Sequence, residues 1–182
     1  MRIYLDNCCF NRPYDSQSDF KILLEPRAKL HVQEAIRCGK FEMIGSYMLE
    51  FENEQNTDRM KKKAIRNFQQ CYSSFYVPIE RREKLQSKIA EIMEYHISYK
   101  DATHVACAIY AKCDCLLTTD TRLMKRYKGN EIIILNPVDF IRMEEEEGYE
   151  RKRSRCSESR HGMSFGKNGY CRGGTVYFFN KV

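Results

Sequence analysis

The 182-residue sequence lacks any run of about 18 apolar residues, so it offers no candidate for a membrane-spanning helix. Its start, MRIYLDNCCF, lacks a signal peptide, because the apolar run there is short and soon interrupted. Its nine cysteines lack the even number and regular spacing of a secreted disulfide framework, and no second pair accompanies Cys113 and Cys115 to make a zinc site. We therefore expect reduced thiols and a cytoplasmic protein without a membrane partner.

The main part of the chain also lacks net charge. Residues 148–182 hold eight basic and two acidic residues, which accounts for the whole net charge of +6, whereas residues 1–147 hold 23 of each. Six of the nine glycines also lie in residues 148–182. We expect one domain over residues 1–147 and a basic, poorly ordered Gly/Ser/Arg-rich tail over residues 148–182. A nucleic-acid-binding arm is the functional alternative for this tail.

Short apolar runs alternate with longer helical patterns over residues 1–147. Strands are expected at residues 2–5, 41–44, 75–77, 115–118 and 132–135, and helices at 19–38, 46–53, 57–74, 80–96, 101–112 and from Pro137 onward. Pro26 should kink or divide the first helix. Strands that are apolar throughout and alternate with helices are typical of a parallel sheet. We therefore expect an α/β fold with three layers, in which helices cover a central, mostly parallel twisted sheet.

Acidic residues stand where this fold would bring them together. Asp6 follows the first strand, Asp120 follows the strand that ends in TTD, and Asp101 opens the helix that leads into that strand. Glu50 and Glu52 follow the second strand. The carboxyl ends of parallel strands share one edge, where ligands bind. Clustered carboxylates repel one another, and a hard divalent cation such as Mg²⁺ removes this penalty.

Each acidic residue also has an ordinary structural explanation. Asp101 and Asp120 could be helix N-caps, and Asp6 could cap a turn into Asn7. Glu50 and Glu52 could lie on a solvated helix face. The joint placement of the acids at one edge favours a common site. His104, one turn after Asp101, is expected to pack in the core or on the surface rather than act as a general base.

Four segments together resemble the PIN-domain family of metal-dependent ribonucleases, which includes the VapC-type bacterial toxins. The segments are IYLDNCCFNRP, SYMLEFEN, DATHVACAIYAKCDCLLTTD and IIILNPVDFI, and the resemblance extends from residue 1 to about 143. It implies that Asp6, Asp101 and Asp120 are catalytic metal ligands, with Glu52 as the fourth and Glu50 as the alternative to Glu52. It also gives Thr118 a supporting role, and Asn7 is a candidate to support the first acid through a hydrogen bond.

The resemblance implies an endoribonuclease that uses Mg²⁺ or Mn²⁺ to hydrolyse RNA phosphodiester bonds. The ions would neutralise charge on the phosphoryl group and lower the pKa of the attacking water. Basic residues near the acids are candidates for contacting the RNA: Arg12, Arg122, Lys125 and Arg126. Besides RNA, an antitoxin protein and a second copy of the chain are partners that the family suggests.

Other functions remain open. A non-catalytic PIN-like module that binds RNA or serves as a scaffold is the main alternative, and DNA is an alternative substrate. A dehalogenase-like phosphotransfer domain would place a second Asp two residues after Asp6, where this sequence has Cys8. A receiver domain would place an acidic pair early in the chain and its phosphoacceptor later, and this pattern is also absent.

Overall fold

The computed structural model describes residues 1–10 and 20–146, and residues Met1–Glu144 form one compact unit. The predicted tail over residues 148–182 and the RNA-binding candidate Arg12 lie outside the described residues. The predicted boundary near Glu147 therefore stays a prediction. Among the described residues, no helix is both long enough and apolar enough to cross a membrane.

The unit is built on one sheet of five parallel strands, in the order β3-β2-β1-β4-β5. The strands are β1 (Arg2–Leu5), β2 (Glu42–Ser46), β3 (Ser73–Val77), β4 (Cys115–Leu117) and β5 (Ile133–Leu135). All five lie where the apolar runs of the sequence predicted them. The predicted α/β fold with a central parallel sheet is confirmed.

Helices connect the strands. They are η1 (Asn7–Cys9), α1 (Phe20–Arg37), α2 (Tyr47–Glu54), α3 (Arg59–Tyr72), η2 (Ile79–Arg81), α4 (Arg82–Met93), α5 (Tyr99–Tyr110) and α6 (Thr121–Arg126), with a further helix over residues 137–146. Pro26 lies inside α1 without dividing it. The short helix α6 was not predicted from the sequence.

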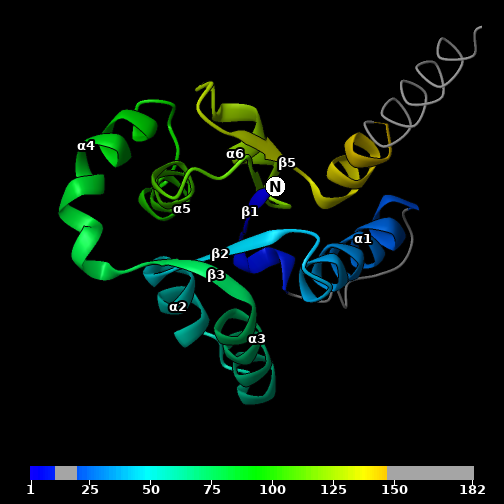
Figure 1. Ribbon diagram of the computed structural model, residues 1–182. Helices are drawn as coiled ribbons and strands as arrows, with labels where there is room; N and C mark the ends of the chain where they lie inside the picture. Colours follow the sequence, from blue (N-terminus) through cyan, green and yellow to red (C-terminus); the bar gives the residue numbers. More distant parts are fainter. Residues whose placement is uncertain (11–19, 147–182) are drawn as a thin grey trace, which may run out of the picture. The chain divides into compact units, whose positions relative to one another are not determined.

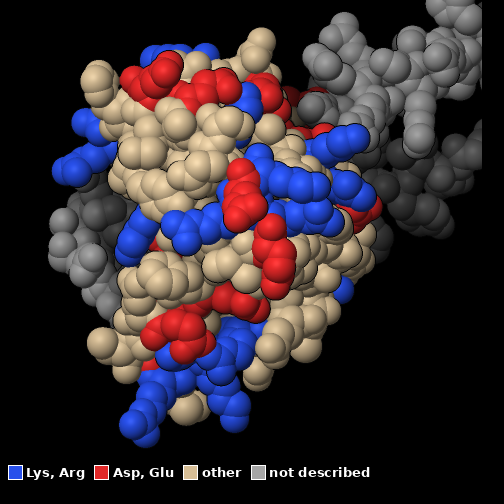
Figure 2. Space-filling model, turned by 90° about the vertical axis from the view of Figure 1, so that its left-hand side faces the viewer, with Lys and Arg blue, Asp and Glu red and all other residues tan. Residues whose placement is uncertain are grey.

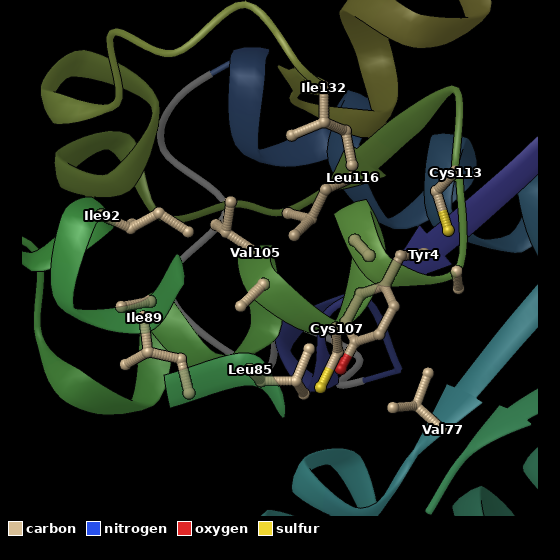
Figure 3. Packing of buried hydrophobic residues seen from close by; sticks show 14 of the residues in the cluster. Tyr4, Val77, Leu85, Ile89, Ile92, Val105, Cys107, Cys113, Leu116 and Ile132 are labelled. Carbon is tan, nitrogen blue, oxygen red and sulfur yellow. The ribbon is translucent and has the colours of Figure 1, made fainter. Parts of the chain in front are cut away.

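Two apolar cores lie on opposite faces of the sheet, because successive strand residues point in opposite directions. Tyr4, Ile44 and Leu116 face α4 and α5 in one core, and Ile3, Leu5 and their neighbours face α1 in the other. Figure 1 shows α4 and α5 on one side of the sheet and α1 on the other, which gives the predicted three layers. In the first core the Tyr4 side chain points toward Cys107 of α5 (Figure 3).

Small side chains allow α5 to lie close to the sheet. Ala102, Ala106, Ala108 and Cys107 are each 0% exposed, so this helix is buried along most of its length. Ser98 caps its N-terminus by accepting a hydrogen bond from the backbone N–H of Asp101. The N-terminus of α5 is thereby fixed at the edge where β1 and β4 end.

Candidate metal centre

Asp6 and Thr118 lie side by side because β1 and β4 are paired neighbours. Leu5 and Leu117 are partners in this pairing, and the backbone N–H of Asp6 donates to the carbonyl oxygen of Leu117 at 3.0 Å. The Thr118 hydroxyl donates to Asp6 Oδ2 at 2.7 Å. Cys8 Sγ donates to the same oxygen at 3.1 Å. Asp6 is therefore held through Oδ2, and Oδ1 has no hydrogen-bond partner among the described residues.

Glu52 reaches the same edge from α2. Ser46, the last residue of β2, caps this helix by accepting from the backbone N–H of Leu49 at 3.3 Å. Asn7 Nδ2 donates to Glu52 Oε2 at 3.0 Å, so the residue after Asp6 orients the carboxylate from the second motif. Burial raises the pKa of Glu52, but His104 and Asn7 outweigh it and lower the pKa below its ordinary value.

Glu50 points away from this edge. Its carboxylate accepts a hydrogen bond of 2.6 Å from the hydroxyl of Tyr76 on β3. Two residues along a helix turn the side-chain direction by about 200°, so Glu50 and Glu52 cannot face the same site. The geometry therefore favours Glu52 for the fourth acidic position.

Asp101 lies in the first turn of α5 rather than at its cap. The Ser98 hydroxyl donates to Asp101 Oδ2 at 2.6 Å. Burial raises the pKa of Asp101, and the negative charges of Asp120 and Asp6 raise it further. Asp101 is therefore close enough to Asp120 and Asp6 for their charges to act on it.

Asp120 has the structural role that the sequence offered as its ordinary explanation. It caps α6, and its Oδ1 accepts from the backbone N–H groups of Arg122 at 2.7 Å and Leu123 at 3.3 Å. Its own N–H donates to the Thr118 hydroxyl at 3.0 Å. Thr118 thus contacts both Asp6 and Asp120, and one oxygen of Asp120 is left beside the cluster.

His104 is the part of this site that sequence reasoning missed. It is 2% exposed, and its Nδ1 lies 2.8 Å from the hydroxyl of Tyr4. Its Nε2 lies 3.1 Å from Glu52 Oε2, but an Nε2–H bond would not point at this oxygen, so the close pair lacks an aligned hydrogen bond. One signal was available, since residues three apart on a helix share a face and Asp101 precedes His104 by three.

The donor atoms suit a divalent cation. Asp6, Glu52 and His104 each offer a ligand atom, and these atoms lie within 4.8 Å of one another. Two polar atoms of the site, His104 Nε2 and Asn7 Oδ1, are buried without a hydrogen-bond partner. A cation at this place would compensate the carboxylates and the bare nitrogen together. Asp101 and Asp120 lie outside this tight group and border it.

The predicted RNA-binding residues that the structure describes lie on α6. Arg122, Lys125 and Arg126 are all exposed, and Arg126 Nη1 also donates to the backbone carbonyl of His96 at 2.5 Å. Arg126 is therefore engaged within the fold. Arg122 and Lys125 face solvent on the helix that Asp120 caps.

A polar cavity of about 310 Å³ adjoins the acids. Asn7 and Glu52 form part of its wall, and Lys61 of α3 contributes a positive charge. Amide side chains complete much of the lining: Asn53, Gln55 and Asn56. Figure 2 shows Lys and Arg side chains gathered at the lower end of one face, the end at which α3 lies in Figure 1, with acidic side chains directly above them.

No protein-family model and no curated protein matches the sequence. Among solved structures, VapBC2 from Rickettsia felis bound to a DNA fragment from its promoter is 13% identical, with a TM-score of 0.47 over 75% of this chain and 98% of that one. FitAB bound to an IR36 DNA fragment is 16% identical (TM-score 0.46; 75% and 95% covered). FitAcB from Neisseria gonorrhoeae is 15% identical (TM-score 0.47; 74% and 97% covered).

The chain has an α/β fold with five parallel strands. This is the kind of fold that the four sequence motifs implied. At 13–16% identity and TM-scores of 0.46–0.47, the similarity to these structures assigns neither a family nor an activity to this chain. The chemistry of the site has to be argued from its own residues.

Proposed function

We propose that this protein is a divalent-metal-dependent endoribonuclease. The observation that carries the proposal is the meeting of Asp6, Glu52 and Asp101 at one edge of a parallel sheet, with Asp120 beside them. Two of these carboxylates share a tight group with a buried imidazole, and the pKa of a third is raised by burial and by its acidic neighbours. Such a site is electrostatically unfavourable without a cation and suited to one.

Asp6 and Glu52 would hold Mg²⁺ or Mn²⁺, with Asp101 and Asp120 as the remaining acidic ligands. The bound ion would neutralise charge developing on the phosphoryl oxygens and lower the pKa of a water molecule. Thr118 and Asn7 keep the carboxylates in place through their hydrogen bonds. Their role is positioning, since each acts through an acid that it contacts.

RNA would be held beside the acids by local contacts, because residues 1–147 carry no net charge. Lys61 in the wall of the polar cavity and the exposed Arg122 and Lys125 on α6 are the described cations for this role. The preference for RNA over DNA rests on the resemblance of the four sequence motifs to PIN-domain ribonucleases.

A cleavage assay tests the proposal. Purified protein is incubated with a panel of RNAs and with DNA of matching sequence, in Mg²⁺, in Mn²⁺ and in excess EDTA. Cleavage of RNA in either metal, and its loss in EDTA and in Asp6→Asn, is the expected result. The matched control is Asp58→Asn, which makes the same chemical change at the cap of α3, where Asn is as good a cap as Asp.

Equal cleavage by wild type and Asp6→Asn, or cleavage unaffected by EDTA, would refute the metal-dependent mechanism. Binding of RNA without cleavage in any metal would support the alternative of a non-catalytic PIN-like module. Cleavage of DNA with equal efficiency would retain the nuclease and correct its substrate.

The proposal extends to a toxin with an antitoxin partner, because the motifs resemble the VapC type. A short open reading frame directly upstream of the gene is the expected finding. Induced expression should then arrest growth, and co-expression of the upstream product should relieve the arrest. Growth arrest that persists with the upstream product, or also occurs with Asp6→Asn, would contradict this extension.

A further inference from the structure

A line of buried polar side chains connects the middle of the sheet to the acidic site. The Tyr4 hydroxyl lies 2.6 Å from Ser46 Oγ and 2.8 Å from His104 Nδ1. His104 Nε2 then lies 3.1 Å from Glu52 Oε2. Tyr4 and Ser46 are 0% exposed, so water does not replace these contacts. A histidine at this depth requires a partner on each ring nitrogen.

Two proton arrangements of the neutral ring are compatible with these distances, and a protonated ring would share the defect of the first, an Nε2–H without an aligned acceptor among the described residues. In the first, Tyr4 donates to Nδ1, and Nε2 carries the ring hydrogen and must donate it to Glu52. Nε2 has no aligned hydrogen-bond partner among the described residues, so this arrangement leaves its N–H unsatisfied. In the second, Nδ1 donates to the Tyr4 oxygen, the Tyr4 hydroxyl donates to Ser46, and Nε2 presents a lone pair.

A bare lone pair close to a carboxylate is repulsive unless a cation lies between them. Oxygen and nitrogen ligands at right angles around one ion, each about 2.1 Å from it, lie about 3.0 Å apart. The observed separation of 3.1 Å between Nε2 and Glu52 Oε2 matches this spacing. A ligand atom of Asp6 lies within 4.8 Å of both. Two ligands on opposite sides of such an ion lie about 4.2 Å apart, so a shift of the Asp6 side chain by up to about 0.6 Å would complete the set.

We propose that His104 Nε2 is itself a ligand of the metal ion, together with Glu52 and Asp6. This inference rests on the proposed metal site and goes beyond it, because the resemblance supplies only acidic ligands. His104 comes from the same face of α5 as Asp101, so one helix would contribute both a nitrogen and an oxygen donor. Tyr4 acts as a positioning residue, since its hydroxyl fixes the ring and the tautomer that exposes the Nε2 lone pair.

A nitrogen ligand changes which ion the site prefers. Mg²⁺ favours oxygen donors and keeps much of its water, whereas imidazole suits first-row transition metals. A mixed set of carboxylates and one imidazole should therefore bind Mn²⁺ more tightly than Mg²⁺. Removing the imidazole should bring the two affinities closer together.

Pulsed electron paramagnetic resonance of bound Mn²⁺ tests this directly, without relying on catalysis. The full-length protein is stripped of metal and loaded with substoichiometric Mn²⁺, and its ¹⁴N couplings are compared with those of a sample in which histidine alone carries ¹⁵N. The expected spectrum shows one directly coordinated histidine nitrogen that changes with the isotope. This measurement needs only the wild-type protein, so it stands even if a variant of the buried His104 fails to fold.

The variants add a second readout. His104→Gln should lose the nitrogen coupling and bind Mn²⁺ at least about tenfold more weakly, while its Mg²⁺ affinity changes less. His31→Gln makes the same change at an exposed position of α1 and should keep both the coupling and the affinity. Affinities are measured by titration of the metal ions alone.

Each outcome separates the two proposals. Bound Mn²⁺ without histidine coupling in the wild type overturns the role of His104 and leaves the metal-dependent nuclease standing. Coupling that persists in His104→Gln also overturns it. Failure of the wild type to bind either ion overturns this inference and the proposed function together.

Discussion

Replacing Tyr4 by Phe removes one oxygen atom from the centre of the fold. The hydroxyl is buried, and it is the partner of both Ser46 Oγ and His104 Nδ1. Ser46 keeps the hydrogen bond from the backbone of Leu49, but His104 Nδ1 loses its partner. The change therefore leaves the buried His104 Nδ1 without a hydrogen-bond partner, while the apolar packing of the residue 4 ring stays in place.

The loss of stability follows from this unpaired buried nitrogen. A buried polar atom without a partner costs about 1–3 kcal/mol, so the free energy of unfolding should fall by about this amount. For a protein of this size, each kcal/mol lowers the melting temperature by about 2–4 °C. The ring of His104 is also released, so Mn²⁺ affinity should drop by about 10–100-fold, as it does when a residue orienting a metal ligand is lost.

Urea unfolding of metal-free protein and titration with Mn²⁺ measure the two effects. The matched control is Tyr127→Phe, because the Tyr127 hydroxyl is buried and has no hydrogen-bond partner among the described residues. That substitution should be neutral or slightly stabilising and should leave Mn²⁺ affinity unchanged. Equal stability of the two variants, or an unchanged Mn²⁺ affinity in Tyr4→Phe, would refute the role assigned to Tyr4.

Four further outcomes are expected. Asp101→Asn should abolish cleavage yet raise the free energy of unfolding of the metal-free protein at neutral pH. The raised pKa of Asp101 means that its charged form is less favourable in the folded than in the unfolded state, so the gain should shrink as the pH falls and wild-type Asp101 becomes protonated. Gly45→Ala should cost about 1–3 kcal/mol in urea unfolding, because the added Cβ meets a serine oxygen at 2.8 Å. Cys107, whose pKa burial raises to about 12, should resist alkylation under native conditions while exposed Cys71 reacts, as peptide mass spectrometry would show; rapid native labelling of Cys107 would contradict its placement. Truncation after Glu147 should leave a folded nuclease with a weaker salt dependence of RNA binding, and unfolding of the truncated chain would contradict the predicted domain boundary.

The sequence was sufficient to locate the edge at which the acids meet. Asp6 and Asp120 each follow an apolar run, and strand ends in a parallel sheet share an edge, so their proximity needed no knowledge of tertiary packing. The supporting role of Thr118 came from the family resemblance, and its hydroxyl does contact Asp6. These features follow from the positions of residues at the ends of strands, which can be recognised in the sequence itself.

Other features depend on packing and were beyond a sequence argument. The choice between Glu50 and Glu52 is set by the rotation of α2 about its axis, which the contact between Tyr76 and Glu50 shows only in three dimensions. From the sequence, His104 was expected to pack in the core or on the surface, and it is buried. Its second role became visible only when β1 brought the Tyr4 hydroxyl to one side of the ring and α2 brought Glu52 to the other.

The way these acids are held also explains how the fold can tolerate them without a cation. Asp120 accepts two backbone N–H groups at the start of α6, and Asp101 lies in the first turn of α5, so both carboxylates sit at the positive end of a helix dipole. Thr118 donates to Asp6 and Asn7 donates to Glu52, so each of these acids also has a neutral donor. The fold therefore compensates part of the negative charge by itself, and under the proposed function a cation is needed for chemistry rather than for folding. Loss of cleavage in EDTA should accordingly occur with the far-ultraviolet circular dichroism spectrum unchanged, which ties the assay to the metal centre and separates it from unfolding.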